Sequence, residues 1–268
     1  MLEVSRLEKR YESRDTLAIA DLTFSAERGE FLSIVGPSGA GKTTLLKCVC
    51  GLLPLSGGKV LLNGRPVYKP PPEMVLVFQD YSRSLYPWLS VLKNVLFALA
   101  KKQEMDQESR LSLAERMLDA VGLKGFSHHY PWELSGGMQQ RVALARALAF
   151  QPEILLMDEP FASVDAQTRA DLEDLLLSLW EKFSITILFV THDIEEATYL
   201  SDRILVLSAS PARTIAELLV GLPRPRDQIE TRSSPRFMEL REILYHTIKG
   251  KSRPAETKVP VPDSKNSG

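Results

Sequence analysis

Short, mostly apolar runs alternate along the chain with longer stretches in which apolar positions recur every three or four residues. The short runs have the length of strands, and the longer stretches have the period of amphipathic helices. Strands that are buried on both faces and separated by helices are typical of parallel sheets, so the pattern predicts an α/β fold with a largely parallel sheet. The predicted strands are Phe31–Val35, Val75–Phe78, Ile154–Met157 and Ile185–Val190.

Helical patterns replace the strand-like runs in the middle of the chain, for example over Leu111–Val121 and Met138–Phe150. This change predicts a helical insert over about residues 82–150. Another helix is predicted near the end, over Arg236–Ile248, and the Pro-, Lys- and Ser-rich residues 251–268 are predicted to be a disordered tail.

Charge is almost balanced, with 33 Lys and Arg against 34 Asp and Glu, so no general field attracts nucleic acid. The charged stretch Met1–Thr16 has no apolar core like that of a signal peptide, and later apolar runs are too short or interrupted to span a bilayer. Cys48 and Cys50 lack the spacing of a metal site, and we expect buried, reduced thiols.

A glycine-rich loop, Gly36-Pro37-Ser38-Gly39-Ala40-Gly41-Lys42-Thr43, follows the first predicted strand and opens a helix that runs to Cys50. This is the setting of a phosphate-binding loop, in which backbone N–H groups and a helix N-terminus face the phosphates. Lys42 would reach the β and γ oxygens, and the Thr43 hydroxyl would bind Mg²⁺. The alternative is a glycine-rich turn before a helix.

Two carboxylates, Asp158 and Glu159, follow the predicted strand Ile154–Met157. Ligands of open α/β sheets bind at the carboxyl ends of strands, so Asp158 is a candidate Mg²⁺ ligand and Glu159 a candidate base for an attacking water. The alternative is a pair of solvated turn residues before Pro160.

His192 and Gln79 also follow predicted strands. His192 could reach the γ-phosphate, and Asp193 with Glu196 predicts a capping box for the next helix. The carbonyl of Gln79 could bind Mg²⁺ or water. Taken singly, His192 could equally be a structural hydrogen-bonding residue and Gln79 an ordinary polar residue.

The stretch Leu134-Ser135-Gly136-Gly137-Met138-Gln139 stands before a predicted helix and resembles the LSGGQ signature of the ABC ATPase family. In that family the signature contacts the ATP held by the other subunit. The resemblance runs from about Tyr11 to about Leu207, with the family's motifs in order. Met138 replaces the Gln of the named motif, and Glu133 stands where many relatives have Gln.

The resemblance implies an ATP-hydrolysing subunit that binds ATP and Mg²⁺ and works as a homodimer. Glu159 and His192 would be catalytic, and Thr43, Gln79 and Asp158 would hold the metal. Tyr11 would stack on adenine, and Asp165 would belong to the D-loop, Ser163-Val164-Asp165. The implied ATP-binding residues are Tyr11, Gly36, Pro37, Ser38, Gly39, Ala40, Gly41, Lys42, Thr43, Thr44, Gln79, Ser135, Gly136, Gly137 and Asp165.

Residues 77–81 and 85–91 look like those of the nitrate, sulfonate and taurine importer ATPases, whose relatives carry small anions and some vitamin precursors. Tyr81, Tyr86 and Trp88 would then line a groove for a coupling helix of a separate permease. Packing of the helical insert on the core is the alternative use of these rings, and the two uses are compatible.

The resemblance therefore implies an α/β P-loop NTPase core of the RecA-like type, with an antiparallel β subdomain and a helical insert. The core would comprise residues 1–81 and 151–235, the signature subdomain 82–150, and a C-terminal helix 236–250. We expect a peripheral protein on the cytoplasmic face of the inner membrane, partnered by permease subunits and an extracytoplasmic solute-binding protein, without nucleic acid.

An exporter ATPase is the nearer alternative. A soluble ABC ATPase acting on DNA or the ribosome is the more distant one, because no sustained heptads or second cassette occur.

Overall fold

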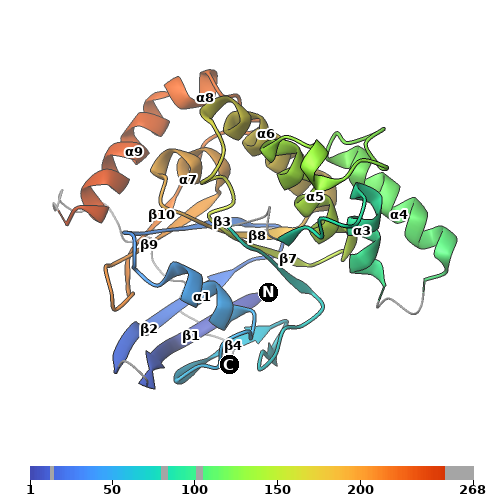
Figure 1. Cartoon of the computed structure of the whole chain (residues 1–268). Coiled ribbons are helices and arrows are strands. Elements are labelled where there is room, and N and C mark those ends of the chain that lie inside the picture. The colour runs from blue at the N-terminus through green and yellow to red at the C-terminus, as the bar shows by residue number, and fades with distance from the viewer. Residues whose placement is uncertain (13–14, 80–83, 101–104, 251–268) are drawn as a thin grey trace, which may run out of the picture.

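The computed structural model describes residues 1–12, 15–79, 84–100 and 105–250. Two sheets share the molecule, one antiparallel and one mostly parallel (Figure 1). The strands are β1 (Leu2–Tyr11), β2 (Thr16–Ala26), β3 (Phe31–Val35), β4 (Gly57–Leu62), β5 (Arg65–Pro66), β6 (Met74–Val77), β7 (Ile154–Asp158), β8 (Thr186–Thr191), β9 (Arg203–Leu207) and β10 (Thr214–Leu219).

Helices cover both faces of the parallel sheet, with α1 between the two sheets and α6, α7 and α9 on the opposite side (Figure 1). The helices α3, α4 and α5 form a separate group beside the sheet, where the insert is predicted. The helices are α1 (Lys42–Val49), α3 (Val91–Leu99), α4 (Gln107–Ala120), η2 (Pro131–Glu133), α5 (Gly136–Ala149), α6 (Ala166–Phe183), α7 (Ile194–Leu200), α8 (Glu230–Ser233) and α9 (Pro235–Ile248).

The larger sheet has the order β10-β9-β3-β8-β7-β6, and all its pairs are parallel except β10 with β9. The smaller sheet, β2-β1-β4-β5, is antiparallel throughout. The predicted α/β fold with an antiparallel subdomain is confirmed. The edge strand β10 was not predicted, because its alternating, largely exposed residues lack an apolar run.

Alternate residues of the central strands enter two different cores. Phe31 and Phe189 pack with the helices of the insert and with α6, α7 and α9, whereas Leu32 and Leu188 pack with α1 and the antiparallel sheet. All four side chains are fully buried, and each such burial stabilises the fold by about 1.5–3 kcal/mol. The sheet is therefore held rigidly from both faces, and the carboxyl ends of β3, β7 and β8 form one fixed edge.

Within the described residues, no helix is both long and apolar enough to cross a membrane. Cys48 and Cys50 are free and buried, as predicted. The predicted tail, residues 251–268, and Tyr81 lie outside the described residues.

Candidate functional site

The glycine-rich loop joins β3 directly to α1, as its motif requires. Gly41 precedes the helix with φ 89°, a left-handed conformation that favours glycine, and a Cβ there would lie 3.1 Å from the carbonyl oxygen of Ala18. Lys42 turns back over the loop, and its Nζ donates to the carbonyl oxygens of Gly36 at 2.9 Å and Pro37 at 3.0 Å. The loop therefore wraps around a buried ammonium group.

The Lys42 ammonium also faces the carboxyl end of β7. Its Nζ lies 3.6 Å from Oε1 of Glu159, and only 5% of the side chain is exposed. Burial lowers the pKa of Lys42, and the attraction of Glu159 and then of Asp158 opposes this shift. An added anion such as a phosphate would find a desolvated cation here, where its charge acts most strongly.

Asp158 ends β7 and is buried. Burial raises the pKa of this carboxyl group, and a hydrogen bond with Thr43 opposes the shift. The hydroxyl of Thr43 on α1 and the carboxylate of Asp158 on β7 thus lie together. Oxygen ligands of this kind suit Mg²⁺, and a bound cation would offset the cost of burying the carboxylate.

Glu159 leaves the strand in a left-handed conformation, with φ 45°. Its backbone N–H donates to the carbonyl oxygen of Val190 on β8 at 2.8 Å, which turns the side chain toward the loop. Oε2 lies 3.0 Å from Nδ1 of His192, just after β8. The Glu159 carboxylate therefore lies between the Lys42 ammonium and the His192 imidazole.

Gln79 and Tyr11 flank this group. Val77 of β6 pairs with Met157 of β7. Gln79, which is exposed, and Glu159, which is half-buried, each come two residues after this pair, so both stand at the same edge of the sheet. The Tyr11 hydroxyl lies 3.1 Å from Oγ1 of Thr44 on α1. Tyr11 therefore reaches the helix that follows the loop. The position of Gln79 at the sheet edge fits a metal ligand and an ordinary polar residue equally well.

The signature lies on α5, which begins two residues earlier than predicted and takes both glycines into its first turn. Ser135 is exposed and caps the helix, accepting from the N–H of Met138 at 3.3 Å. A Cβ on Gly137 would lie 2.6 Å from Cγ2 of Thr168, so glycine allows α5 to approach α6. Among the described residues, no hydrogen bond of Ser135 reaches the group around Lys42.

Asp165 caps α6 and contacts the same Thr168. Its carboxylate accepts from the backbone N–H of Thr168 at 3.0 Å and from the hydroxyl at 2.7 Å, and these bonds lower its pKa. The segment 163–165 is thereby tied to the residue that packs against the signature.

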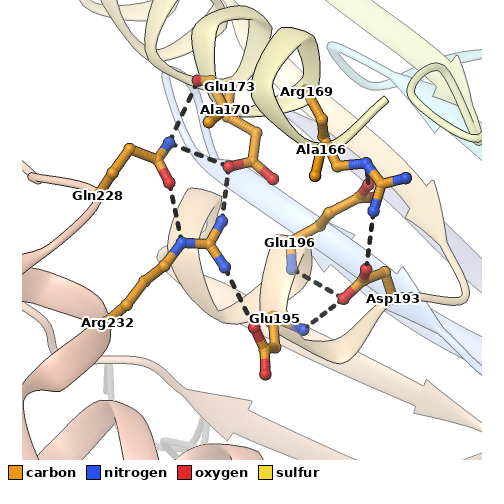
Figure 2. Close-up of a pocket in the computed structure, with 9 residues that line it drawn as sticks. All are labelled: Ala166, Arg169, Ala170, Glu173, Asp193, Glu195, Glu196, Gln228 and Arg232. Carbon is orange, nitrogen blue, oxygen red and sulfur yellow. Dashed lines mark hydrogen bonds and ion pairs between the residues drawn. The ribbon is translucent and has the colours of Figure 1, made fainter. Parts of the chain in front are cut away.

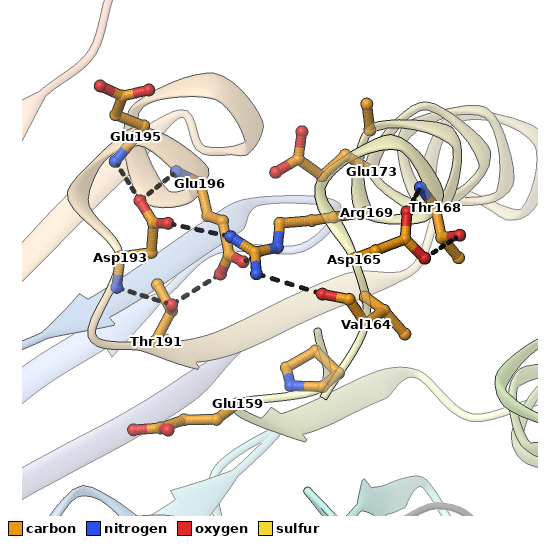
Figure 3. A network of polar contacts seen from close by, with 12 residues as sticks. Glu159, Val164, Asp165, Thr168, Arg169, Glu173, Thr191, Asp193, Glu195 and Glu196 are labelled. Carbon is orange, nitrogen blue, oxygen red and sulfur yellow. Dashed lines mark hydrogen bonds and ion pairs between the residues drawn. The ribbon is translucent and has the colours of Figure 1, made fainter. Parts of the chain in front are cut away.

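The predicted capping box on α7 is only half present. Asp193 caps the helix by accepting from the N–H groups of Glu195 and Glu196. The Glu196 carboxylate does not return to the backbone of Asp193; it accepts from the hydroxyl of Thr191 at 2.6 Å and faces Arg169 of α6 (Figure 3). The hydroxyl at the end of β8 competes with the backbone for this carboxylate.

Two residues around the site were missed by sequence reasoning. Arg169 approaches Asp193 and Glu196, and the buried Gln140 of α5 donates to the carbonyl oxygen of Pro160, next to Glu159. Each is an ordinary polar residue within a helix pattern. Their roles depend on contacts with segments that are distant in the sequence, and the sequence of a single chain gives no signal for such contacts.

A cavity of about 840 Å³ lies between β6 and the helical group, and its lining reaches Phe78, the residue before Gln79. Its wall includes Phe78, Tyr86, Phe97 and Phe150. The Tyr86 ring packs on Phe97 with centroids 4.5 Å apart, whereas its other neighbour, Trp88, is 69% exposed. Of the predicted aromatic cluster, Tyr86 therefore packs within the chain and Trp88 faces outward.

Comparison with known families matches residues 19–162 to the family described as "ABC transporter". The matched part includes the glycine-rich loop, the signature and the carboxylates that end β7.

Individual proteins agree with this match. An uncharacterized ABC transporter ATP-binding protein of Methanocaldococcus jannaschii, MJ0412, is 46% identical over 92% of this chain and 91% of its own. The nitrate import ATP-binding protein NrtD of Synechococcus elongatus is 41% identical over 85% of each chain. The dimeric post-hydrolysis structure of the cassette MJ0796, bound to ADP and Pi, aligns with TM-score 0.70 and 31% identity over 82% of this chain and 99% of the other.

Proposed function

This chain belongs to the ABC transporter family and is an ATPase of that family, and from this premise we propose that it drives import of a small anion through a separate permease. Nitrate and organic sulfonates are the cargo class we favour. Support comes from the relative NrtD, which is named for nitrate import, and from the resemblance of residues 77–81 and 85–91 to importers of such anions.

The observation that carries the proposed chemistry is the position of the Glu159 carboxylate, 3.6 Å from Lys42 Nζ and 3.0 Å from His192 Nδ1. Lys42 would pair with the β and γ oxygens of ATP in place of its present carbonyl partners. Glu159 would then orient the attacking water and accept its proton, and His192 would donate a hydrogen bond to the γ-phosphate.

Thr43 and Asp158, with Gln79 entering from β6, would hold Mg²⁺. The hydroxyl and buried carboxylate fit this ion because both are oxygen ligands and the carboxylate lacks full solvation. When bound, the ion neutralises charge on the phosphates. Asp158 has no other proposed role, which leaves Glu159 free to act on water.

Two chains would share two ATP molecules, each between the glycine-rich loop of one chain and Ser135, Gly136 and Gly137 of the other. Support comes from the exposure of Ser135 at the start of a helix whose N–H groups and dipole favour anions. The ADP- and Pi-bound relative is also dimeric. In this proposal the second copy completes each site, because Ser135 caps its own helix and makes no hydrogen bond with the Lys42 group of the same chain among the described residues.

The cavity that reaches Phe78, with Trp88 at its side, would receive a helix of the permease. Its apolar wall suits the apolar face of an amphipathic helix, and Arg146 supplies one polar partner. This docking would place the chain on the cytoplasmic face of the membrane. An extracytoplasmic solute-binding protein would deliver the anion to the permease.

Uptake and export can be separated by an experiment in cells that lack this chain. Cells carrying the wild type should accumulate isotopically labelled nitrate or a sulfonate, and cells carrying Glu159→Gln should not. Normal accumulation without the chain, together with impaired release from preloaded cells, would contradict import. Equal expression of the two forms is the required control.

A further inference from the structure

The Thr191 hydroxyl joins the two residues that flank His192 and also binds the buried Glu196. The Thr191 hydroxyl donates to Oε2 of Glu196 at 2.6 Å, and Thr191 Oγ1 accepts from the backbone N–H of Asp193 at 2.9 Å (Figure 3). The residues before and after His192 therefore share one anchor. With 6% of its side chain exposed, Glu196 is far less accessible than His192, at 59%.

Arg169 of α6 joins this anchor to the segment 163–165. Its Nε lies 3.5 Å from Oε1 of Glu196, and its terminal nitrogens lie 3.4 Å from Oδ2 of Asp193 and 3.4 Å from the carbonyl oxygen of Val164 (Figure 3). One planar group thus contacts two segments that are distant in sequence. All three distances exceed the roughly 2.7–2.9 Å of a tight charge-assisted bond, so Arg169 is shared among its partners and not locked to one.

The groups that face Glu196 are the neutral hydroxyl of Thr191 on β8 and charged side chains from α6 and the start of α7. Burial raises the pKa of Glu196 to about 7; the Thr191 hydroxyl and Arg169 lower it, and Asp193 and Glu173 raise it. Arg169 is thus the cation that favours the carboxylate. A second arginine in the same pocket, Arg232, is engaged elsewhere, by Glu173 at 2.6 Å and Glu195 at 3.4 Å (Figure 2).

We propose that Arg169 is a positioning residue for ATP hydrolysis, which holds His192 against Glu159 through Glu196 and Asp193 and links that position to Val164. Because Val164 lies in the segment tied to the signature side through Thr168, Arg169 would relay closure of the dimer to the His192 segment. This inference rests on the proposed role of His192. Arg169 itself touches no reacting atom.

The pocket supplies a matched control for simple loss of an ion pair. Arg232 of α8 pairs with Glu173, whose side chain is 1% exposed, much as Arg169 pairs with Glu196. Arg232 also contacts Glu195 of α7, but its hydrogen bonds go to Gln228, Glu195 and Glu173, and none of them reaches Thr191, His192 or Asp193. Breaking this pair should destabilise the fold without moving His192.

The test compares Arg169→Ala, Arg169→Lys, Arg232→Ala and His192→Ala in the purified full-length chain, with kcat and KM for ATP measured between pH 5.5 and 9. Arg169→Ala should lower kcat on the order of tenfold with KM changed less than about twofold, since ground-state binding is untouched. The pH midpoint at which its rate rises should also lie higher than in the wild type. The reason is that Glu196 has lost the cation that favours its carboxylate, so its pKa rises. Arg169→Lys should restore the wild-type pH midpoint, and Glu196→Gln should remove that part of the profile.

Arg232→Ala should keep the wild-type kcat and pH profile while its melting temperature falls. An equal loss of kcat in Arg232→Ala, or wild-type kcat and profile in Arg169→Ala, would overturn the inference. If His192→Ala cuts turnover while Arg169→Ala does not, only this inference fails. If His192→Ala hydrolyses ATP at the wild-type rate, the proposed catalytic role of His192 fails first.

Discussion

The imidazole of His192 and the carboxylate of Glu159 lie 3.0 Å apart, although they directly follow two different strands of the sheet. The contact follows from the parallel pairing of β7 with β8, which brings their carboxyl ends to the same edge. A further link, from the Glu159 N–H to Val190, fixes the turn that aims the carboxylate. Two groups suited to γ-phosphate chemistry are therefore positioned by the sheet itself.

Replacing His192 with Ala should reduce turnover about 10²–10³-fold, the usual effect of removing one donor to developing negative charge. ATP binding should change little, because Lys42 and the loop are untouched. Steady-state hydrolysis and equilibrium binding measured on the same preparation check this. Turnover within twofold of wild type would return His192 to a structural role.

Lys42→Ala should weaken ATP binding roughly 10- to 100-fold, which corresponds to the loss of about 1.5–3 kcal/mol from a charged hydrogen bond. Calorimetric titration with ATP provides the measurement, and Lys59→Ala, at an exposed position on β4, is the matched control. Equal affinity in both variants would count against the phosphate-loop assignment.

Trp88 and Asn94 should behave as opposites. Asn94 is buried and holds the 86–90 segment through bonds to the backbone of Tyr86, Leu89 and Ser90. Asn94→Ala should lower the free energy of unfolding by about 1–3 kcal/mol, because it removes the side-chain partners of the part-buried Tyr86 N–H, Tyr86 carbonyl and Leu89 carbonyl. Trp88→Ala should change stability by less than about 0.5 kcal/mol, since the ring is mostly exposed, yet weaken capture of the permease. Unchanged permease capture together with early melting of Trp88→Ala would make Trp88 a packing residue.

The strands show how far local pattern reaches. Phe31–Val35 is predicted to the residue, because polar turns bound it on both sides. The predictions for β6 and β8 are each one residue out of place, because their ends follow pairing with β7: Met74 and Thr186 both pair with Ile154. The apolar run of a single strand does not predict how that strand pairs with its neighbour, so it does not predict where the strand ends.

The residues of the candidate site also fall into two groups: those marked by a local motif and those that depend on contacts between distant segments. Lys42, Asp158, Glu159 and His192 are predicted from sequence because each stands at a strand end or within a phosphate-loop motif, and the fold brings their side chains together. Arg169 depends on contacts with a residue 24 positions away, and no local signal marks it. The capping box fails for a related reason, since Thr191 binds the carboxylate assigned to it.

Stability should depend on the titration of Glu196, whose pKa burial raises from 4.5 to about 7. Below pH 4.5 the group is protonated in both states. Between about 4.5 and 7 the unfolded chain releases the proton that the folded chain retains, so stability falls with rising pH by up to about 3 kcal/mol and then levels off. Denaturant melts give the free energy of unfolding at each pH. Plotted against pH across this range, this free energy should fall more steeply for the wild type than for Glu196→Gln. Parallel curves would contradict the assignment.

The shared-site account is tested most directly by light scattering of Glu159→Gln with and without saturating Mg-ATP. The amide keeps the shape of Glu159 but removes the proposed base, so ATP should persist and hold two chains together through Lys42 of one and Ser135 of the other. The account predicts that Glu159→Gln has the molecular mass of one chain without nucleotide and the mass of two chains in Mg-ATP. Adding Ser135→Arg should abolish the ATP-dependent dimer, because a long cation would occupy the γ-phosphate position. A Glu159→Gln protein that stays monomeric in Mg-ATP, or a double variant that still dimerises, would contradict the shared site.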